Sequence, residues 1–299
     1  MFVFRDKDLM TMLEAGIAGM LIVRRGQRGE IGLVETKIGD NNNTVVTKWD
    51  KASEAAILPI LLASGLNVRS EEVGFAGNSK RSDLIYVVDP LDGSKPFAIR
   101  AMTSTLSVAL FDTVLKQVIA CVVLEPATGR IWFARKGQGT WCFFYNSNLE
   151  FDLREARRCS VWDGQLGAGS IVLVDCYRDF QLAGHPVTSN EVWSDFMGEL
   201  FSGQSGMYNF GTNCLYYALL ACGGNGMAGA VTTCRGGPHD ITPVLLALEA
   251  GGCAQGYSNK TGVLTEVDPL NVLECNFMLA GNNQDTLTAL TSLFKKHLA

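Results

Sequence analysis

Apolar residues recur along this chain with two periods, one typical of helices and one typical of buried strands. Residues 9–23 carry apolar side chains at helical spacing, and Gly26 is the predicted end of that helix. A second helix is predicted over residues 51–64, with Asp50 as its N-cap. The chain is therefore expected to begin with two helices.

Short apolar runs separated by turn-forming residues predict strands through the rest of the N-terminal half. These runs cover residues 44–47, 84–88, 105–110, 118–124, 131–134 and 140–144. After a polar run over 145–158, strands at 170–174 and 229–233 alternate with helices at 192–200, 214–222 and 241–250. Such alternation is typical of an α/β layer. We therefore predict an α/β fold in two domains, a helix-flanked, strand-rich half over residues 1–150 and an α/β half over residues 151–299.

The strand predicted at residues 84–88 ends in a concentration of acids. It is followed by the segment Asp89-Pro90-Leu91-Asp92-Gly93-Ser94. Two carboxylates at the end of a buried strand are costly to desolvate without a counter-charge, which a bound cation would supply. Gly93 and Ser94 add a flexible backbone and a capping hydroxyl beside amides that can hold an anion. This combination indicates a metal-assisted phosphate site, and a solvated turn is the alternative interpretation.

Four acidic positions share one setting, because each lies where an apolar strand or turn gives way to a helix start. They are Asp50, the pair Glu71 and Glu72, the pair Asp89 and Asp92, and Asp240. Taken singly, each is explained by a helix cap or a solvated acid, and Asp240 has the position of an N-cap for the helix at 241–250. Taken together, they predict one shared site.

Composition and charge narrow the classes of function. A hydrophobic share of 47% with 18% charged residues is typical of a well-cored globular chain. The formal net charge of -5 provides no general basic field, so we expect no direct nucleic-acid binding, and no stretch is long and apolar enough to span a membrane. The nine cysteines lack zinc spacing, and the first residues lack a signal-peptide core. We therefore expect a cytoplasmic protein whose cysteines are reduced and buried.

Four motifs, in order, resemble those of the inositol monophosphatase family. They are Thr47-Lys48-Trp49-Asp50, Ser70-Glu71-Glu72, Asp89-Pro90-Leu91-Asp92-Gly93-Ser94, and His239-Asp240 followed by Glu249-Ala250-Gly251-Gly252. Members are magnesium-dependent, lithium-sensitive phosphomonoesterases, related to fructose-1,6-bisphosphatase and to 3'(2'),5'-bisphosphate nucleotidases. The resemblance implies alternating helix and sheet layers, a site between two halves, and a homodimer.

The resemblance also implies a ligand set for two or three Mg²⁺ ions. Glu71 and Asp89, with the Leu91 carbonyl, match the ligands of the first ion, and Asp89, Asp92 and Asp240 match those of the second. Oxygen-only ligands suit Mg²⁺, which keeps several waters and accepts phosphate oxygens into its shell.

Three residues match the catalytic groups of the family: Asp50, Ser94 and Glu71. The family activates its attacking water with metal and a threonine–aspartate pair, whose places are taken here by Ser94 and Asp50. The amides of Gly93 and Ser94, at the start of a following helix, are expected to hold the phosphate.

The residues expected to contact the organic part of a small phosphorylated substrate are Asp92, Gly211, Thr212, Asn213 and Thr233. Thr233 stands where inositol phosphatases of the family carry a glutamate. Further candidates are Glu72, Lys95 and His239. His239 replaces a family tryptophan, and Lys95 after Ser94 resembles the nucleotidase branch.

The main hypothesis is a magnesium-dependent phosphatase for an inositol monophosphate-like substrate. One alternative is a 3'(2'),5'-bisphosphate nucleotidase of the same superfamily. A second alternative is a catalytically weak, regulatory binding protein on the same fold, as some bacterial relatives are implicated in contacts with the transcription machinery.

Overall fold

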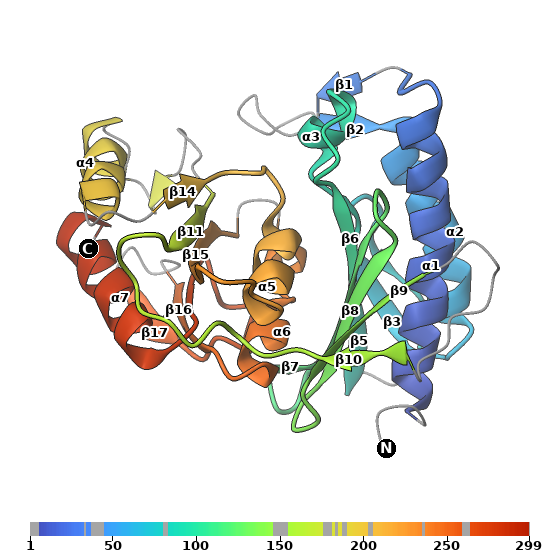
Figure 1. Ribbon diagram of the computed structural model, residues 1–299. Helices are drawn as coiled ribbons and strands as arrows, with labels where there is room; N and C mark the ends of the chain where they lie inside the picture. The colour runs from blue at the N-terminus through green and yellow to red at the C-terminus, as the bar shows by residue number, and fades with distance from the viewer. Residues whose placement is uncertain are drawn as a thin grey trace.

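The computed structural model describes residues 6–32, 34–36, 45–79, 83–145, 155–175, 181–182, 185–186, 190–202, 206–234, 237–258 and 264–298. Helices and sheets alternate in layers across the molecule (Figure 1). The order is α1 (Lys7–Arg28) and α2 (Lys48–Leu62), an eight-stranded sheet, α5 (Asn213–Ala221) and α6 (Val244–Glu249), a six-stranded sheet, then α4 (Asn190–Ser202) and α7 (Gln284–Leu298). The predicted layered α/β fold is confirmed.

The first helix runs further than the sequence pattern predicts. It begins after Asp6, whose side chain accepts a hydrogen bond of 2.9 Å from the Leu9 N–H, and it continues through Gly26. The predicted end at Gly26 is wrong. A Cβ at Gly26 would lie 2.6 Å from Trp49 and 2.7 Å from Phe97, so the glycine permits close packing inside the helix.

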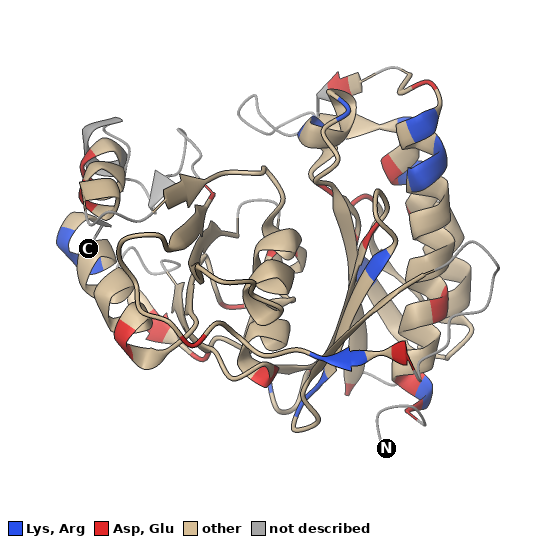
Figure 2. Ribbon diagram, viewed as in Figure 1, with Lys and Arg blue, Asp and Glu red and all other residues tan. Residues whose placement is uncertain are grey.

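Charged residues at the helix ends follow the helix dipole. Positive side chains gather at the C-terminal ends of α1 and α7, where the last turns carry Arg25 and Arg28, and Lys295 and Lys296 (Figure 2). Cations there are favoured by the partial negative charge of the unpaired carbonyls. Among the described residues, no helix has the length and apolar character needed to cross a membrane.

The second helix begins earlier than predicted, and Asp50 is not its N-cap. The N-cap is Thr47, whose hydroxyl accepts from the Trp49 N–H at 3.1 Å. Asp50 occupies the third helical position, and its carboxylate accepts from the Thr47 N–H at 2.7 Å. This reciprocal arrangement is a capping box, which fixes the Asp50 carboxylate at the helix N-terminus.

The eight-stranded sheet has the order β10-β9-β8-β7-β6-β5-β3-β4. Its strands are β3 (Asn67–Ser70), β4 (Gly74–Ala76), β5 (Leu84–Asp92), β6 (Thr105–Asp112), β7 (Gln117–Glu125), β8 (Arg130–Arg135), β9 (Thr140–Phe144) and β10 (Arg157–Arg158). The β3–β5 pair is parallel and the other neighbouring pairs are antiparallel.

The strand β5 runs beyond its predicted end at residue 88. It continues to Asp92, and its register against β6 breaks between Asp89 and Asp92. Proline has no N–H to donate, so it is tolerated where the ladder is already irregular. The chain then turns at Gly93, which has a φ of +83°, into the short helix α3 (Ser94–Ala98). The left-handed backbone at this turn favours glycine.

The six-stranded sheet has the order β14-β11-β15-β18-β16-β17. Its strands are β11 (Ile171–Val174), β14 (Gly206–Tyr208), β15 (Met227–Thr233), β16 (Cys253–Ser258), β17 (Thr265–Val267) and β18 (Phe277–Gly281). The pairs of β11 with β14 and β15 are parallel. Two small hairpin sheets pair β1 (Val34–Thr36) with β2 (Val45–Thr47) and β12 (Gln181–Leu182) with β13 (His185–Pro186).

The helix predicted at 241–250 is shorter in the structure, and Asp240 does not cap it. The helix α6 has Pro243 at its N-cap position, without a side-chain cap. Asp240 instead ends a 3-10 helix, η3 (Pro238–Asp240). The interpretation of Asp240 as an N-cap is therefore wrong.

Alternating residues of the central strands supply separate hydrophobic cores. Ala109 and Phe111 of β6 pack in the core that contains α5 and α6. Val108 and Leu110 of the same strand pack in the core that contains α1 and α2. A third core lies between the six-stranded sheet and helices α4 and α7. Each fully buried valine, leucine or phenylalanine side chain in these cores contributes roughly 1.5–3 kcal/mol relative to exposure.

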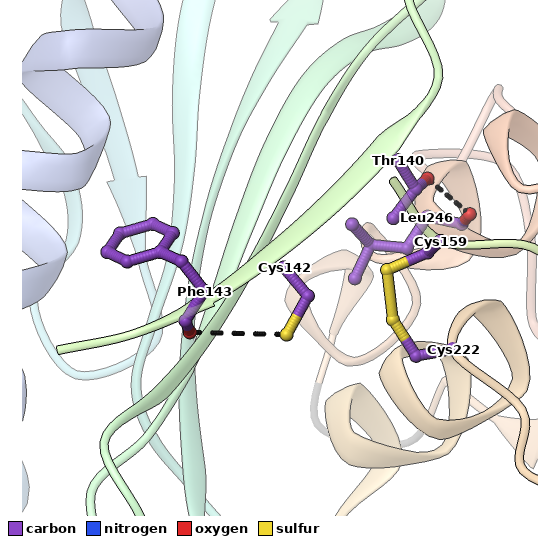
Figure 3. The surroundings of a disulfide bond; sticks show 6 residues. All are labelled: Thr140, Cys142, Phe143, Cys159, Cys222 and Leu246. Atoms are coloured by element: carbon purple, nitrogen blue, oxygen red, sulfur yellow. Dashed lines mark hydrogen bonds between the residues drawn. A yellow bond between two sulfur atoms is a disulfide. The ribbon is translucent and has the colours of Figure 1, made fainter. Parts of the chain in front are cut away.

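The expectation that all cysteines are reduced is contradicted. Cys159 and Cys222 form a disulfide, which ties the segment after β10 to the C-terminal end of α5 (Figure 3). Among the described residues, six other cysteines are free thiols, of which Cys121, Cys214 and Cys275 are buried as expected. The two bonded residues lie 63 positions apart, and only the fold brings them together.

The two large sheets divide the chain near the predicted boundary. The eight-stranded sheet uses residues up to Arg158, and the six-stranded sheet begins at Ile171. Residues 146–154, which contain the predicted division between 150 and 151, lie outside the described residues. The division into two domains at that point stays a prediction.

Candidate active site

Five predicted acids come together beside the end of β5. Asp89 and Asp92 lie at the end of that strand, and Glu71 and Asp240 interact electrostatically with Asp89. Asp50, in the first turn of α2, interacts with Glu71. Asp50 and Asp240, the first and the last of these acids, lie far apart in the sequence, so their meeting in one cluster depends on the layered fold. The predicted shared site is therefore present as a geometric cluster.

Asp50 is a buried acid, and both of its carboxylate oxygens accept hydrogen bonds. Its Oδ2 accepts from the Thr47 N–H at 2.7 Å and from the Thr47 hydroxyl at 2.6 Å. Its Oδ1 accepts from the Ser94 hydroxyl at 2.6 Å. Ser94 Oγ also lies 3.2 Å from the Leu91 carbonyl oxygen. The Ser94–Asp50 pair is thus preformed, and Thr47 holds the aspartate by hydrogen bonds to its other oxygen, Oδ2.

The same face of α2 supports two other segments of the cluster, through residues that the sequence analysis did not select. Ser53 donates to the Pro90 carbonyl at 2.7 Å. Glu54 accepts from the Ser70 hydroxyl and, at 3.2 Å each, from the backbone N–H groups of Glu72 and Val73. Positions three and four after Asp50 share its helix face, which is the signal that could have found them.

Asp92 is held mainly by the N-terminus of α5. Its Oδ2 accepts from the Cys214 N–H at 2.7 Å and from the Thr105 hydroxyl at 3.1 Å, and its Oδ1 accepts from the Asn213 N–H at 3.3 Å. Asp89 Oδ1 accepts from the Leu91 N–H at 3.0 Å. Both carboxylates therefore have fixed orientations.

Two groups in the cluster have the spacing of metal ligands. Ligand atoms of Glu71, Asp89 and His239 all lie within 4.8 Å of one another, and so do those of Asp89, Asp92 and Cys214. Burial raises the pKa of the Cys214 thiol well above its usual value, which disfavours the thiolate that a metal needs. The remaining donors are carboxylate oxygens and one imidazole. The carboxylate oxygens of this set fit a hard divalent cation such as Mg²⁺.

Burial changes the acidity of the clustered carboxyls. The pKa of Asp89 is raised well above its usual value by desolvation and by the charges of Glu71, Asp92 and Asp240. Desolvation raises the pKa of Asp92 to about 7, although hydrogen bonds from Cys214 and Thr105 oppose it. These directions describe the protein without a cation, whose charge would favour the ionised forms.

The metal-free protein is therefore expected to lose stability as the pH rises. An unfolded aspartate titrates near pH ~3.9. Above that pH the unfolded chain binds fewer protons than the folded chain, so stability falls as the pH approaches about 7, the folded pKa of Asp92. Thermal melts from pH 4 to 8 in EDTA should show this decline, and added Mg²⁺ should raise the melting temperature more at pH 8 than at pH 5. A Mg²⁺ effect equal at both pH values would contradict the expectation.

The predicted phosphate-binding turn lies against the predicted substrate loop. A Cβ at Gly93 would lie 2.4 Å from the Thr212 hydroxyl oxygen and 3.1 Å from the Gly211 carbonyl oxygen. The close approach requires glycine at position 93, in addition to its positive φ. Ser94 is the first residue of α3, so the Gly93 and Ser94 amides lie at a helix start.

The predicted substrate residues Asn213 and Thr233 meet a buried acid that the sequence analysis missed. The Asn213 side-chain amide donates to Asp175 at 3.2 Å and to the Thr233 carbonyl at 3.1 Å, and the Thr233 hydroxyl donates to Asp175 at 2.8 Å. Asp175 follows the buried strand β11, and an acid at a strand end is the signal that singled out Asp89. Lys95 is exposed on α3, and Glu72 is half-buried in the turn bound by Glu54.

The layered fold and the carboxylate cluster beside the end of β5 agree with the family resemblance of the motifs. The family model described as "Inositol monophosphatase family" matches residues 7–298. The chain belongs to that family.

Curated relatives match shorter segments. A fructose-1,6-bisphosphatase from Pyrococcus furiosus is 37% identical over 92 residues, which are 31% of this chain and 35% of the relative. A protein named Nus factor SuhB from Haemophilus influenzae is 32% identical over 124 residues, 41% of this chain and 44% of the relative. The matches thus span less than half of these relatives' lengths.

Solved structures match over nearly the whole chain. SuhB from Bartonella henselae has a TM-score of 0.73 at 21% identity, covering 96% of this chain and 98% of that one. An inositol monophosphatase from Anabaena has a TM-score of 0.69 at 21% identity, covering 97% and 95%. At 21% identity, the similarity to these solved structures establishes that this chain shares their fold.

Proposed function

We propose that this protein is a magnesium-dependent phosphatase that hydrolyses a small phosphomonoester resembling an inositol monophosphate. Membership of the family supports a general phosphatase role. The observation that carries the proposal is the cluster of four carboxylates beside the Ser94–Asp50 pair, in which Asp89 and Asp92 are buried and Glu71 and Asp240 are partly buried. Carboxylate charges that are gathered and desolvated in this way are stabilised by bound cations.

The proposed ligands follow from the cluster and the family resemblance. Glu71, Asp89 and the Leu91 carbonyl would hold one Mg²⁺, and Asp89, Asp92 and Asp240 a second, with two or three ions per site. When bound, Mg²⁺ would supply positive charge for the substrate phosphate and for the attacking and leaving oxygens. The hydrogen bonds to Asp89 and Asp92 would keep these carboxylates in place before the ions arrive.

Ser94 and Asp50 are proposed to accept the proton of the attacking water. The Ser94 hydroxyl would accept a hydrogen bond from the water while it donates its own hydrogen to Asp50, 2.6 Å away. The raised pKa of Asp50, caused first by desolvation, makes this carboxylate a better proton acceptor than an exposed aspartate. Glu71 would assist from the metal side of the same water.

The remaining residues are proposed to bind the substrate. The Gly93 and Ser94 amides would donate to phosphate oxygens. Asp92, Gly211, Thr212, Asn213 and Thr233 would face the organic part, and His239 and Glu72 border it. Because helix α3 has five residues, these amide hydrogen bonds would matter more than a helix dipole.

Two other functions have their own supporting observations. Lys95, exposed at the start of α3, could bind a second phosphate, which favours a 3'(2'),5'-bisphosphate nucleotidase. The similarity to proteins named Nus factor SuhB favours a regulatory binding role with weak catalysis. Homodimer formation, lithium inhibition and a cytoplasmic location are proposed from family membership, and size-exclusion chromatography and lithium titration test the first two.

Phosphate release with Mg²⁺ from a substrate panel tests these proposals. The panel contains inositol 1-phosphate, adenosine 3',5'-bisphosphate, fructose 1,6-bisphosphate, histidinol phosphate and glycerol 2-phosphate. Inositol 1-phosphate is expected to be cleaved fastest, and EDTA should abolish the release. If the adenosine bisphosphate is preferred and Lys95→Ala removes that preference, the nucleotidase is correct. If a metal-bound protein releases no phosphate from any ester, the regulatory role is correct.

A further inference from the structure

His239 brings a nitrogen donor into the carboxylate cluster. Its Nε2 lies 3.9 Å from Glu71 Oε2 and 3.7 Å from Asp240 Oδ1. The side chains of His239, Glu71 and Asp240 are 7%, 14% and 13% exposed, respectively, so the histidine is buried and both carboxylates are largely shielded from solvent. Asp89 completes the group, since ligand atoms of Glu71, Asp89 and His239 lie within 4.8 Å of one another.

Both separations are short enough for the two atoms to be ligands of one ion. Both exceed the roughly 2.7–3.2 Å of a nitrogen–oxygen hydrogen bond. A divalent ion bound at about 2.1 Å from each ligand allows two ligand atoms to lie at most about 4.2 Å apart. The distances of 3.7 Å and 3.9 Å lie within that limit. The imidazole nitrogen therefore has room for a cation between itself and either carboxylate.

The backbone around His239 fixes the ring in this direction. The His239 carbonyl accepts from the Thr242 hydroxyl at 3.2 Å and from the Cys214 thiol at 3.6 Å, which anchors η3 to the start of α6 and to α5. Gly237 has a φ of +140°, and a Cβ there would lie 2.8 Å from the ring carbon Cε1. The ring thus occupies a space that a side chain at position 237 would fill, and it reaches the cluster from a fixed support.

We propose that His239 Nε2 is a ligand of the metal ion held by Glu71 and Asp89, and that the site consequently prefers a divalent transition ion such as Mn²⁺ to Mg²⁺. The inference rests on the proposed function for the position of the metal. Imidazole is a softer donor than carboxylate, and it suits first-row transition ions better than magnesium. A site made of carboxylates alone would favour Mg²⁺. Adding one imidazole ligand shifts the selectivity of the site toward a transition ion such as Mn²⁺.

A protonated His239 paired with Glu71 and Asp240 is the competing arrangement. In that case the imidazolium occupies the place of a cation and excludes one of the ions. The two arrangements differ in a direct observable, because only the ligand arrangement puts a nitrogen nucleus next to the metal.

The test is electron spin-echo modulation spectroscopy of the intact protein loaded with Mn²⁺, together with calorimetric titration of Mn²⁺ and Mg²⁺. The wild type should show ¹⁴N modulation, and His239→Ala should lose it. Loss of a group that only hydrogen-bonds to a metal ligand lowers metal affinity about 10- to 100-fold, so loss of this ligand itself should weaken Mn²⁺ binding by at least about tenfold. Mg²⁺ binding should change far less. His297→Ala, in which the histidine removed pairs with Glu199 on the far side of the fold, should keep the modulation.

Absence of ¹⁴N modulation in the wild type, or its persistence in His239→Ala, would overturn the inference in favour of the ion pair. If His239→Ala does not fold, His239→Gln supplies the same comparison with a polar side chain of similar reach. The result is separate from the proposed function. Nitrogen ligation in a protein that cleaves no phosphate ester would refute the phosphatase and leave the metal ligand standing, and cleavage without nitrogen ligation would do the reverse.

Discussion

Replacing Asp89 with asparagine is expected to lower kcat/KM for the best substrate by at least about 10³-fold, because a bound metal contributes several kcal/mol of charge stabilisation and each 1.36 kcal/mol is tenfold in rate. Asp89 is 2% exposed and belongs to both groups with the spacing of metal ligands. Asparagine keeps the shape and an acceptor for the Leu91 N–H but removes the charge that both proposed ions share. Steady-state phosphate release and calorimetric Mg²⁺ titration measure the two effects together.

A matched control separates the metal effect from general damage. Asp195→Asn makes the same chemical change at an exposed position on α4 and should leave activity and Mg²⁺ affinity unaltered. The Asp89→Asn protein should fold at least as well as the wild type without metal, since it removes a buried, mutually repelled carboxyl group. Unchanged turnover together with unchanged Mg²⁺ affinity would remove Asp89 from the ligand set and with it the proposed mechanism.

The acids of the site could be predicted because each follows a local signal. Asp89 and Asp92 end a buried strand, and a charge in that position requires a partner or an ion. The order of the motifs then implied that distant acids meet, and the fold brings Asp50, Glu71 and Asp240 to Asp89. The layered fold could be predicted for the same reason, because the change from a helical to a strand period of apolar residues is also a local signal.

The supporting residues escaped prediction because their roles depend on packing. The prediction of Asp50 as an N-cap places this residue outside the helix, so residues 53 and 54 are not grouped with it. In the structure, Asp50 lies inside α2, and residues 53 and 54 share its helix face. Gly26 was read as a helix stop, although the neighbouring Trp49 and Phe97 rings are what require it. The Cys159–Cys222 disulfide depends on two segments that meet only in the folded chain. The packing around Gly26 and the pairing of Cys159 with Cys222 have no signature in a single sequence.

Substituting Ser94 with alanine is expected to lower kcat by about 10²- to 10⁴-fold, the usual contribution of general base catalysis. The change removes the hydroxyl that lies 2.6 Å from Asp50 Oδ1. Asp50 remains held by the Thr47 N–H and hydroxyl, so its position should survive the substitution. Because no side-chain atom of Ser94 is a proposed metal ligand, Mg²⁺ affinity should stay near that of the wild type. Single-turnover phosphate release measures the rate, and calorimetry measures the affinity.

Ser94→Thr provides the decisive comparison, since threonine restores the hydroxyl and also matches the residue type usual in the family. This variant should keep kcat within about tenfold of the wild type, because a hydroxyl at the same position can again relay the proton to Asp50. If threonine were as slow as alanine, the loss would come from disturbed packing around Gly93 and Thr212 instead of from the missing hydroxyl. If alanine were as fast as serine, the attacking water would have to lose its proton to another group, and Glu71 is the remaining carboxylate proposed to contact that water.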